Sequence, residues 1–218
     1  MNDINLIHGD SLQALKSYGD NHFDWAIVDP PYGIDIANKF AATSGKMGKA
    51  ARKSTFTHKD WDKNVPDANY FAELKRVSKN QIIWGWNYYV AYLNTCPSYI
   101  VWNKKTNGGF ADCESDWCSK QGAARVFEYL WNGMLQQNMK DKEIRIHPTQ
   151  KPVALYKWLL ETYTSEGDLI LDTHLGSGSI AIASHYMKRN FVGYEIDQEY
   201  YENACKRFKE QTAQVALW

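Results

Sequence analysis

Short apolar runs alternate with stretches of helical periodicity along most of this chain. Seven of these runs have the composition and length of strands, and the run at residues 23–28 is apolar enough to be a buried strand. The predicted strands cover residues 4–7, 23–28, 81–84, 99–102, 126–131, 169–171 and 191–194. An alternation of strands and helices of this kind predicts an α/β fold.

Helical spacing of apolar residues predicts the elements between these strands. Pro152 is well placed for the first turn of a helix, because proline lacks the N–H that such a turn leaves unpaired. Helices are predicted at residues 12–16, 67–78, 88–93, 179–187 and 199–209, and in the stretch that follows Pro152. Two polar stretches, residues 33–66 and 103–124, are predicted to be excursions with little regular structure.

Composition narrows the class of protein. With 218 residues, 44% of them hydrophobic, we expect one globular domain spanning residues 1–218. No apolar run approaches the roughly 18 residues needed to span a bilayer, and the first ten residues do not resemble a signal peptide. The cysteines at positions 96, 113, 118 and 205 predict neither a disulfide framework nor a zinc site. A reduced, cytoplasmic protein without a metal is therefore expected.

Charge is balanced over the whole chain but concentrated in one place. The 25 basic and 25 acidic side chains cancel, which excludes a uniformly basic nucleic-acid binder. Residues 39–63 hold seven Lys or Arg against two Asp, a net charge of +5. This stretch is predicted to contact phosphates, with Lys49, Arg52 and Lys53 as the candidate residues, although a solvated loop would have the same composition.

A glycine turn near the C-terminus indicates a cofactor site. The predicted strand at residues 169–171 leads through Asp172 to Gly176 and Gly178, and a helix is predicted to begin at Ser179. Such a turn lets the backbone approach a ligand closely and points free N–H groups at it. Glu195 ends the next strand, where a carboxylate can bind ribose hydroxyls. This pattern alone fits an NAD site, an S-adenosylmethionine site, or a tight turn with a solvated glutamate.

The tetrapeptide Asp29-Pro30-Pro31-Tyr32 directly follows the buried strand at residues 23–28. The Asp29 carboxylate and the Pro30 carbonyl can accept the two hydrogens of an exocyclic amino group, while the Tyr32 ring stacks on the base. Because Pro31 has no N–H, it holds the preceding carbonyl without local pairing. A plain Pro-Pro turn after a strand is the structural alternative.

These residues and several further motifs resemble the amino-group DNA methyltransferases, which make N6-methyladenine or N4-methylcytosine. The motifs are His8-Gly9-Asp10-Ser11, Asp29-Pro30-Pro31-Tyr32, Ile83-Trp84-Gly85-x-Asn87, Val101-Trp102-x-Lys104, His147-Pro148-Thr149-x-Lys151-Pro152, the glycine turn, and Gly193-x-Glu195. They cover nearly the whole chain. Their order, with the catalytic motif before the cofactor glycines, is similar to the circularly permuted β class of that family.

The resemblance implies a Rossmann-like methyltransferase fold with a mixed, mostly parallel, seven-stranded sheet. In the permuted order the strand that ends at Glu195 is expected to lie beside the strand at residues 4–7. The family's motif implies that Asp29, Pro30, Pro31 and Tyr32 are catalytic. The cofactor-binding residues that it implies are Asp10, Asp29, Lys151, Asp172, Gly176, Gly178, Ser179 and Glu195. His174 departs from the family, which usually has an aromatic residue at this position.

The activity implied is methyl transfer from S-adenosylmethionine to an amino group of a base in DNA. An Asp at position 29 favours N6 of adenine, whereas N4 of cytosine, an RNA base or a protein glutamine are the alternatives. An NAD enzyme would have no use for the Asp29–Tyr32 motif, and its intact residues argue against a non-enzymatic remnant. Residues 33–66 and 103–137 are expected to recognise DNA, and members of this class often form homodimers.

Overall fold

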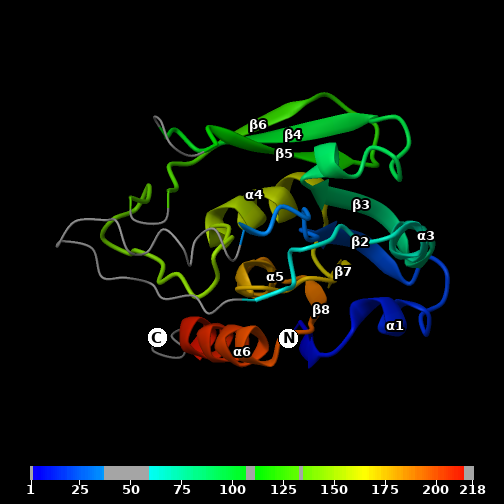
Figure 1. Ribbon diagram of the computed structural model, residues 1–218. Coiled ribbons are helices and arrows are strands. Elements are labelled where there is room, and N and C mark those ends of the chain that lie inside the picture. Colours follow the sequence, from blue (N-terminus) through cyan, green and yellow to red (C-terminus); the bar gives the residue numbers. More distant parts are fainter. Residues whose placement is uncertain (1, 37–58, 107–110, 133–134, 214–218) are drawn as a thin grey trace.

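The computed structural model describes residues 2–36, 59–106, 111–132 and 135–213 (Figure 1). Within these residues the strands form one eight-stranded sheet with the order β1-β8-β7-β2-β3-β5-β4-β6. The strands are β1 (Ile4–His8), β2 (Phe23–Val28), β3 (Ser78–Trp84), β4 (Ser98–Asn103), β5 (Cys113–Cys118), β6 (Arg125–Glu128), β7 (Leu169–Asp172) and β8 (Asn190–Glu195). All neighbouring pairs are parallel except those of β5, which is antiparallel to both β3 and β4.

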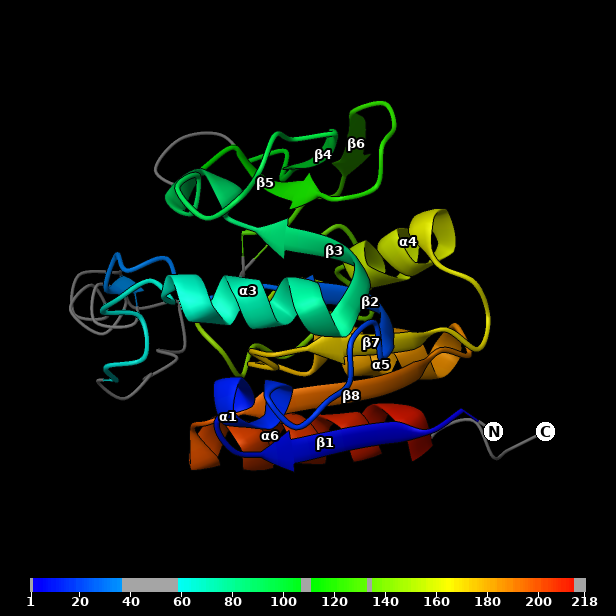
Figure 2. The ribbon, with the colours of Figure 1, turned by 90° about the vertical axis from the view of Figure 1, so that its right-hand side faces the viewer.

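Helices cover both faces of the sheet (Figure 2). The helical elements are α1 (Ser11–Leu15), α3 (Ala68–Val77), the 3-10 turn η1 (Trp86–Tyr88), α4 (Val153–Tyr163), α5 (Ser179–Tyr186) and α6 (Gln198–Thr212). In Figure 2, α1 and α3 lie in front of the sheet, and α4, α5 and α6 lie behind it. The fold is therefore a three-layered α/β arrangement of the Rossmann-like type.

The strand β2 shows why helices must cover both faces of the sheet. Trp25 and Ile27 pack into the cluster formed with α4 and α5, whereas Ala26 and Val28 pack into the cluster formed with α3. Successive residues of a strand point to opposite faces, so the apolar run at residues 25–28 is stable only between two helical layers. Each large apolar side chain buried in this way contributes about 1.5–3 kcal/mol.

Most of the predicted elements are confirmed. Each of the seven predicted strands corresponds to a strand of the sheet, and the expected long-range pairing is present. The strand β1 is parallel to β8, with Ile4 opposite Phe191 and His8 opposite Glu195. Residues from the two ends of the chain therefore meet at one side of the sheet.

Three local predictions were wrong. The sheet has eight strands instead of seven, because β5 lies inside the polar stretch that was expected to lack regular structure. Glu114 pairs with Lys104 and Lys151, and Asp116 accepts the Ile100 N–H, so acidic residues interrupt the apolar pattern of this strand in the sequence. The helix expected at residues 88–93 is only the 3-10 turn η1, and the strand expected at residues 126–131 ends at Glu128.

No helix among the described residues is long and apolar enough to cross a membrane. All four cysteines are free, at positions 96, 113, 118 and 205. In the same part of the chain, no group of three or more His, Cys, Asp or Glu side chains is arranged to hold a metal ion.

Candidate active site

Two cavities lie where parallel strands end. The smaller has a volume of about 230 Å³ and is lined by residues that follow β1, β7 and β8. The larger has a volume of about 420 Å³, and the segment after β2 forms part of its wall. Because β7 is the neighbour of both β2 and β8, these segments leave the same edge of the sheet. Open α/β sheets bind their ligands at this edge.

Glu195 lines the smaller cavity and is held by the glycine turn, whose residues Gly176 and Gly178 do not themselves line it. Gly176 and Gly178 have φ values of +52° and +71°, a left-handed conformation that favours glycine. The Gly176 N–H donates to Glu195 Oε2 at 2.8 Å, and the Asp197 N–H donates to Oε1 at 3.0 Å. Burial raises the pKa of Glu195, although these backbone donors oppose the shift. The turn therefore fixes the orientation of a carboxylate that lines the cavity.

Asp10 lies on the other side of the smaller cavity, at the start of α1. Its Oδ1 accepts hydrogen bonds from the N–H groups of Leu12 at 2.8 Å and Gln13 at 3.3 Å, so the carboxylate caps the helix. Asp10 and Glu195, far apart in the sequence, thus line the same cavity.

His174 lines the smaller cavity where the family usually has an aromatic residue. Its ring packs edge-on against Tyr70 at 5.5 Å between centroids, and its Nδ1 lies 2.9 Å from Thr173 Oγ1. Burial lowers the pKa of His174 to about 4, so the ring is neutral at neutral pH. A neutral imidazole in an aromatic contact can supply much of the packing surface of the missing aromatic ring.

Asp172 does not reach solvent. It is buried at the end of β7, and its Oδ1 accepts the N–H of His174 at 3.0 Å. Burial raises the pKa of Asp172 to about 8, so its carboxyl is mostly protonated at pH 7. Ser179, also buried, donates its hydroxyl to the carbonyl of Lys151 at 2.7 Å. Asp172 and Ser179 thus support the glycine turn, and neither residue lines either cavity.

The segment after β2 lines the larger cavity with Asp29, Pro30, Pro31 and Tyr32. The Tyr32 hydroxyl donates to Asp29 Oδ1 at 2.6 Å. The carbonyl of Pro30 accepts the hydroxyl of Tyr89 at 2.6 Å, so it is not free of partners as the sequence suggested. A carbonyl has two lone pairs, and one remains for a ligand.

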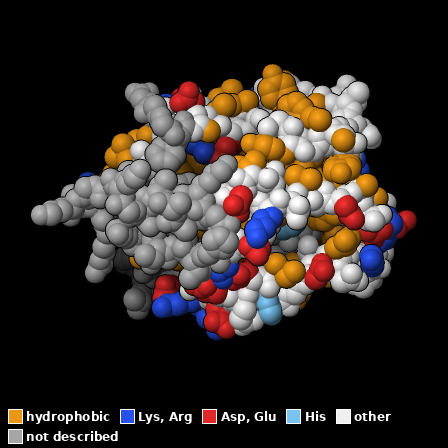
Figure 3. Space-filling view, viewed as in Figure 1, with side chains coloured by type: hydrophobic (Ala, Val, Ile, Leu, Met, Phe, Trp, Pro, Cys, Tyr) orange, Lys and Arg blue, Asp and Glu red, His pale blue; other side chains and the backbone are white. Residues whose placement is uncertain are grey.

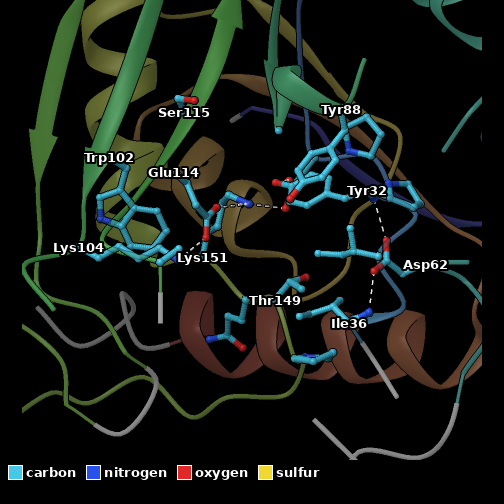
Figure 4. Close-up of a pocket in the computed structure, with 18 of the residues that line it drawn as sticks. Tyr32, Ile36, Asp62, Tyr88, Trp102, Lys104, Glu114, Ser115, Thr149 and Lys151 are labelled. Carbon is cyan, nitrogen blue, oxygen red and sulfur yellow. Dashed lines mark hydrogen bonds and ion pairs between the residues drawn. The ribbon is translucent and has the colours of Figure 1, made fainter. Parts of the chain in front are cut away.

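The ring of Tyr32 is held between neighbours. It stacks on Tyr88, with centroids 4.9 Å apart and planes inclined by 11° (Figure 4). A Cβ at Gly85 would lie 2.2 Å from the Tyr32 ring, and the φ of Gly85 is +68°. Glycine is therefore required at position 85 to let β3 end against this ring.

Asp62 is a site residue that sequence reasoning missed. It is buried, and its carboxylate accepts the N–H groups of Tyr32 at 2.7 Å, Gly33 at 3.0 Å and Ile36 at 2.8 Å. These bonds fold the chain after Pro31 around one side chain (Figure 4). In the sequence, Asp62 was counted only as a charge within the basic stretch.

A row of charged side chains that begins at Asp29 also lines the larger cavity. The ammonium of Lys151 contacts Asp29 Oδ2 and lies 3.1 Å from Glu114 Oε2, while Lys104 contacts Glu114 Oε1. Burial alone would raise the pKa of Glu114, but the two ammonium groups outweigh it and hold the pKa at about 2. Burial opposes the charge of Lys151, yet Asp29 and Glu114 raise its pKa above the ordinary value.

Lys151 therefore faces the Asp29–Tyr32 motif. The cofactor role that the resemblance implies for it stays a prediction. Glu114 lies on β5, and its place beside Lys104 and Lys151 becomes visible only in the fold.

The candidate DNA-binding residues Lys49, Arg52 and Lys53 lie outside the described residues. Two other cations of the basic stretch are described, and both have acidic partners. Lys59 pairs with Asp197 and Glu199 on the α6 side, and Lys63 pairs with Asp60.

The fold is that of the Rossmann-like methyltransferases. A family model described as "DNA methylase" matches residues 79–206. The type II methyltransferase M.HpaI of Haemophilus parainfluenzae is 37% identical over 246 residues, covering 96% of this chain and 75% of that protein. M2.MboI of Moraxella bovis is 24% identical over 251 residues, covering 96% of this chain and 89% of that protein. The chain belongs to the DNA methylase family.

Solved structures support the same fold. A complex of M1.HpyAVI with S-adenosylmethionine has a TM-score of 0.55 at 22% identity, covering 94% of this chain and 99% of that one. The PvuII DNA methyltransferase, described as cytosine-N4-specific, has a TM-score of 0.61 at 13% identity, covering 98% and 92% of the two chains.

Proposed function

We propose that this protein transfers the methyl group of S-adenosylmethionine to N6 of an adenine in DNA. The observation that carries the proposal is the position of Asp29 and Pro30. Two hydrogen-bond acceptors stand on the wall of a base-sized cavity, at the same sheet edge as a second cavity lined by Asp10 and Glu195. Membership of the DNA methylase family and the similarity to type II methyltransferases support DNA as the substrate.

The residues around the smaller cavity suit the nucleoside part of S-adenosylmethionine. The Glu195 carboxylate is oriented by two backbone donors and can accept hydrogen bonds from the ribose hydroxyls. Asp10 lines the same cavity and can accept from an adenine amino group, while Gly176 and Gly178 shape the turn that orients Glu195. When bound, the cofactor supplies a methyl group on a positively charged sulfur, which is already activated for transfer.

Residues around the larger cavity suit an amino group attached to an aromatic ring. The base is taken out of the duplex at a cost of a few kcal/mol, because its amino group is not accessible within the stack. Asp29 and the free lone pair of the Pro30 carbonyl accept the two amino hydrogens. With both hydrogens bound, the nitrogen becomes pyramidal and its lone pair is freed from the ring. Tyr32 then supplies the stacking surface, on which Tyr88 now lies.

Orientation supplies most of the rate enhancement in this proposal. Holding the nitrogen in line with the methyl donor can contribute about 7–11 kcal/mol in favourable cases. Adenine is preferred over cytosine because of Asp29, since Ser is commoner at this position in cytosine enzymes. Recognition of DNA by residues 33–66 and 103–137, including Lys49, Arg52 and Lys53, and assembly as a homodimer remain predictions.

Replacing Asp29 tests the assignment of the catalytic motif. We expect Asp29→Ala to abolish transfer of labelled methyl groups to DNA while cofactor affinity stays within about tenfold of wild type, because the lost bond is to the target amino group. The assay should include RNA and protein substrates, which separates the alternatives. A variant that keeps more than about a tenth of wild-type turnover would show that Asp29 has another role. Asp20→Ala, which removes an exposed partner of Arg76 in the loop before β2, is the matched control.

A further inference from the structure

The charged wall of the larger cavity has a definite order. Asp29, Lys151, Glu114 and Lys104 follow one another, so that negative and positive groups alternate. Figure 4 shows Lys151, Glu114 and Lys104 side by side. All four residues line the cavity. Starting at Asp29, the wall therefore presents a hydrogen-bond acceptor, a donor and a second acceptor.

Lys151 is held firmly at the centre of this row. Its side chain is only 3% exposed, and its ammonium lies 5.2 Å from the centre of the Trp84 ring. An ammonium has three N–H donors. One donates to Asp29, and the ammonium forms an ion pair with Glu114 Oε2 at 3.1 Å. No hydrogen-bond partner for a further Lys151 N–H is found among the described residues, so such a donor is available to a ligand in the cavity.

Glu114 can also accept a further hydrogen bond. Its Oε2 is buried and makes no hydrogen bond within the described part of the chain, and its contact with Lys151 is an ion pair at 3.1 Å. Both lysines keep the carboxylate ionised at neutral pH. A negative charge thus stands next to the Lys151 donor and faces the cavity.

The order of groups on this wall matches one edge of adenine. When Asp29 accepts the amino group, the next position on the base edge is a ring nitrogen, N1 in adenine and N3 in cytosine. Both are acceptors and both suit Lys151. The position after that differs, because adenine has a weakly positive C2–H whereas cytosine has the carbonyl oxygen O2.

We propose that Lys151 and Glu114 read the edge of the target base. Lys151 donates to the ring nitrogen beside the amino group, and Glu114 lies against C2–H of adenine and repels O2 of cytosine. This inference rests on the proposed function and adds the residues that select adenine. It assigns discrimination to a repulsive contact with the wrong base, which is an efficient source of specificity.

The first test uses the wild-type protein and a DNA duplex that carries its mapped methylation site. Replacing the target adenine by 1-deazaadenine removes only the acceptor that Lys151 would bind. We expect kcat/KM to fall about 10- to 100-fold, as for loss of a hydrogen bond to a charged group, while the control 7-deazaadenine stays within about threefold of adenine. Equal rates for 1-deazaadenine and adenine would overturn the proposal, as would an equal loss with both analogues.

The second test concerns Glu114. In Glu114→Gln the side-chain amide can donate to O2 of cytosine. We expect the ratio of kcat/KM for a cytosine target to that for an adenine target to rise about tenfold or more. Glu128→Gln, which changes an exposed partner of Lys105 on β6, is the matched control and should leave the ratio unchanged. Calorimetric titration with S-adenosylmethionine confirms that each variant is folded.

An unchanged ratio in a folded Glu114→Gln protein would overturn the inference while the proposed function stands. If that variant does not fold, the analogue test on the wild-type protein decides. Nucleoside analysis of the wild-type product distinguishes a failure of the proposed function from a failure of this inference. Formation of N4-methyldeoxycytidine alone would overturn the adenine assignment and, with it, this inference.

Discussion

Single side chains at the strand ends determine which ligand each cavity can hold. Glu195 is an example, because its role depends on both its charge and its orientation. It is 8% exposed, and both of its oxygens already accept backbone hydrogen bonds from the turn and from the start of α6. Such a carboxylate loses little conformational freedom when ribose hydroxyls bind to it.

Replacing Glu195 should weaken cofactor binding. The lost charge-assisted hydrogen bond is worth about 1.5–3 kcal/mol, so we expect Glu195→Ala to reduce affinity for S-adenosylmethionine about 10- to 100-fold in isothermal titration. Glu195→Gln keeps one of the two acceptor oxygens and should lose less affinity than the Ala variant. Glu202→Ala, an exposed change on α6, serves as the control. Unchanged affinity in the Ala variant would rule out the ribose contact.

At the scale of elements, the segment after β2 is organised by Asp62. Three backbone N–H groups donate to its carboxylate, and one of them belongs to Tyr32. The shape of this segment, and with it the position of the Tyr32 ring, thus depends on a residue that lies far from Tyr32 in the sequence. Asp62 is a positioning residue in this sense.

We expect Asp62→Ala to lower the free energy of unfolding by about 2 kcal/mol or more, because three donors lose their acceptor. Methyl transfer should fall with it. Asp60→Ala is the control on the same segment, since Asp60 is exposed and its pair with Lys63 contributes about 0–1 kcal/mol. Urea unfolding curves measure both variants. Equal stability of the two would show that Asp62 does not hold the segment.

The sequence predicted those elements whose pattern is local. The apolar run of β2 and the motif after it are continuous in the chain, so both could be recognised directly. The strand β5 could not, because Glu114 and Asp116 interrupt its apolar pattern. Glu114 is compensated by Lys104 and Lys151, and Asp116 is buried with its pKa raised by burial. These partners come from other parts of the chain and become visible only in the fold.

The pairing of β1 with β8 could be expected from motif order alone, since the order implied that the two ends of the chain meet. Asp62 shows the opposite case. Its three contacts form across a sequence separation that includes residues outside the described part of the chain. No pattern in the sequence distinguishes such an acceptor from a solvated aspartate.

For the whole molecule, the distribution of charge decides how DNA is approached. Figure 3 shows basic and acidic side chains interspersed on the face that it views, in keeping with a net charge of zero. The described cations Lys59 and Lys63 are both paired with carboxylates. Contact with phosphates is therefore expected from the other basic residues of the stretch at residues 39–63.

Replacing Lys49, Arg52 and Lys53 together by Ala tests this expectation. Each phosphate contact releases counterions, so the slope of log affinity against log salt should decrease by up to about 3 units. DNA binding measured by fluorescence anisotropy at several salt concentrations gives the slope. The control is Lys188→Ala, which removes an exposed partner of Glu166. A slope equal to that of wild type would mean that these three side chains face solvent.

The chemical identity of the product tests the proposed reaction most directly. DNA incubated with the purified protein and S-adenosylmethionine is digested to nucleosides and analysed by mass spectrometry. We expect N6-methyldeoxyadenosine in the wild-type reaction and none with Asp29→Ala. N4-methyldeoxycytidine in the absence of N6-methyldeoxyadenosine, or no methylated nucleoside at all, would contradict transfer to adenine N6.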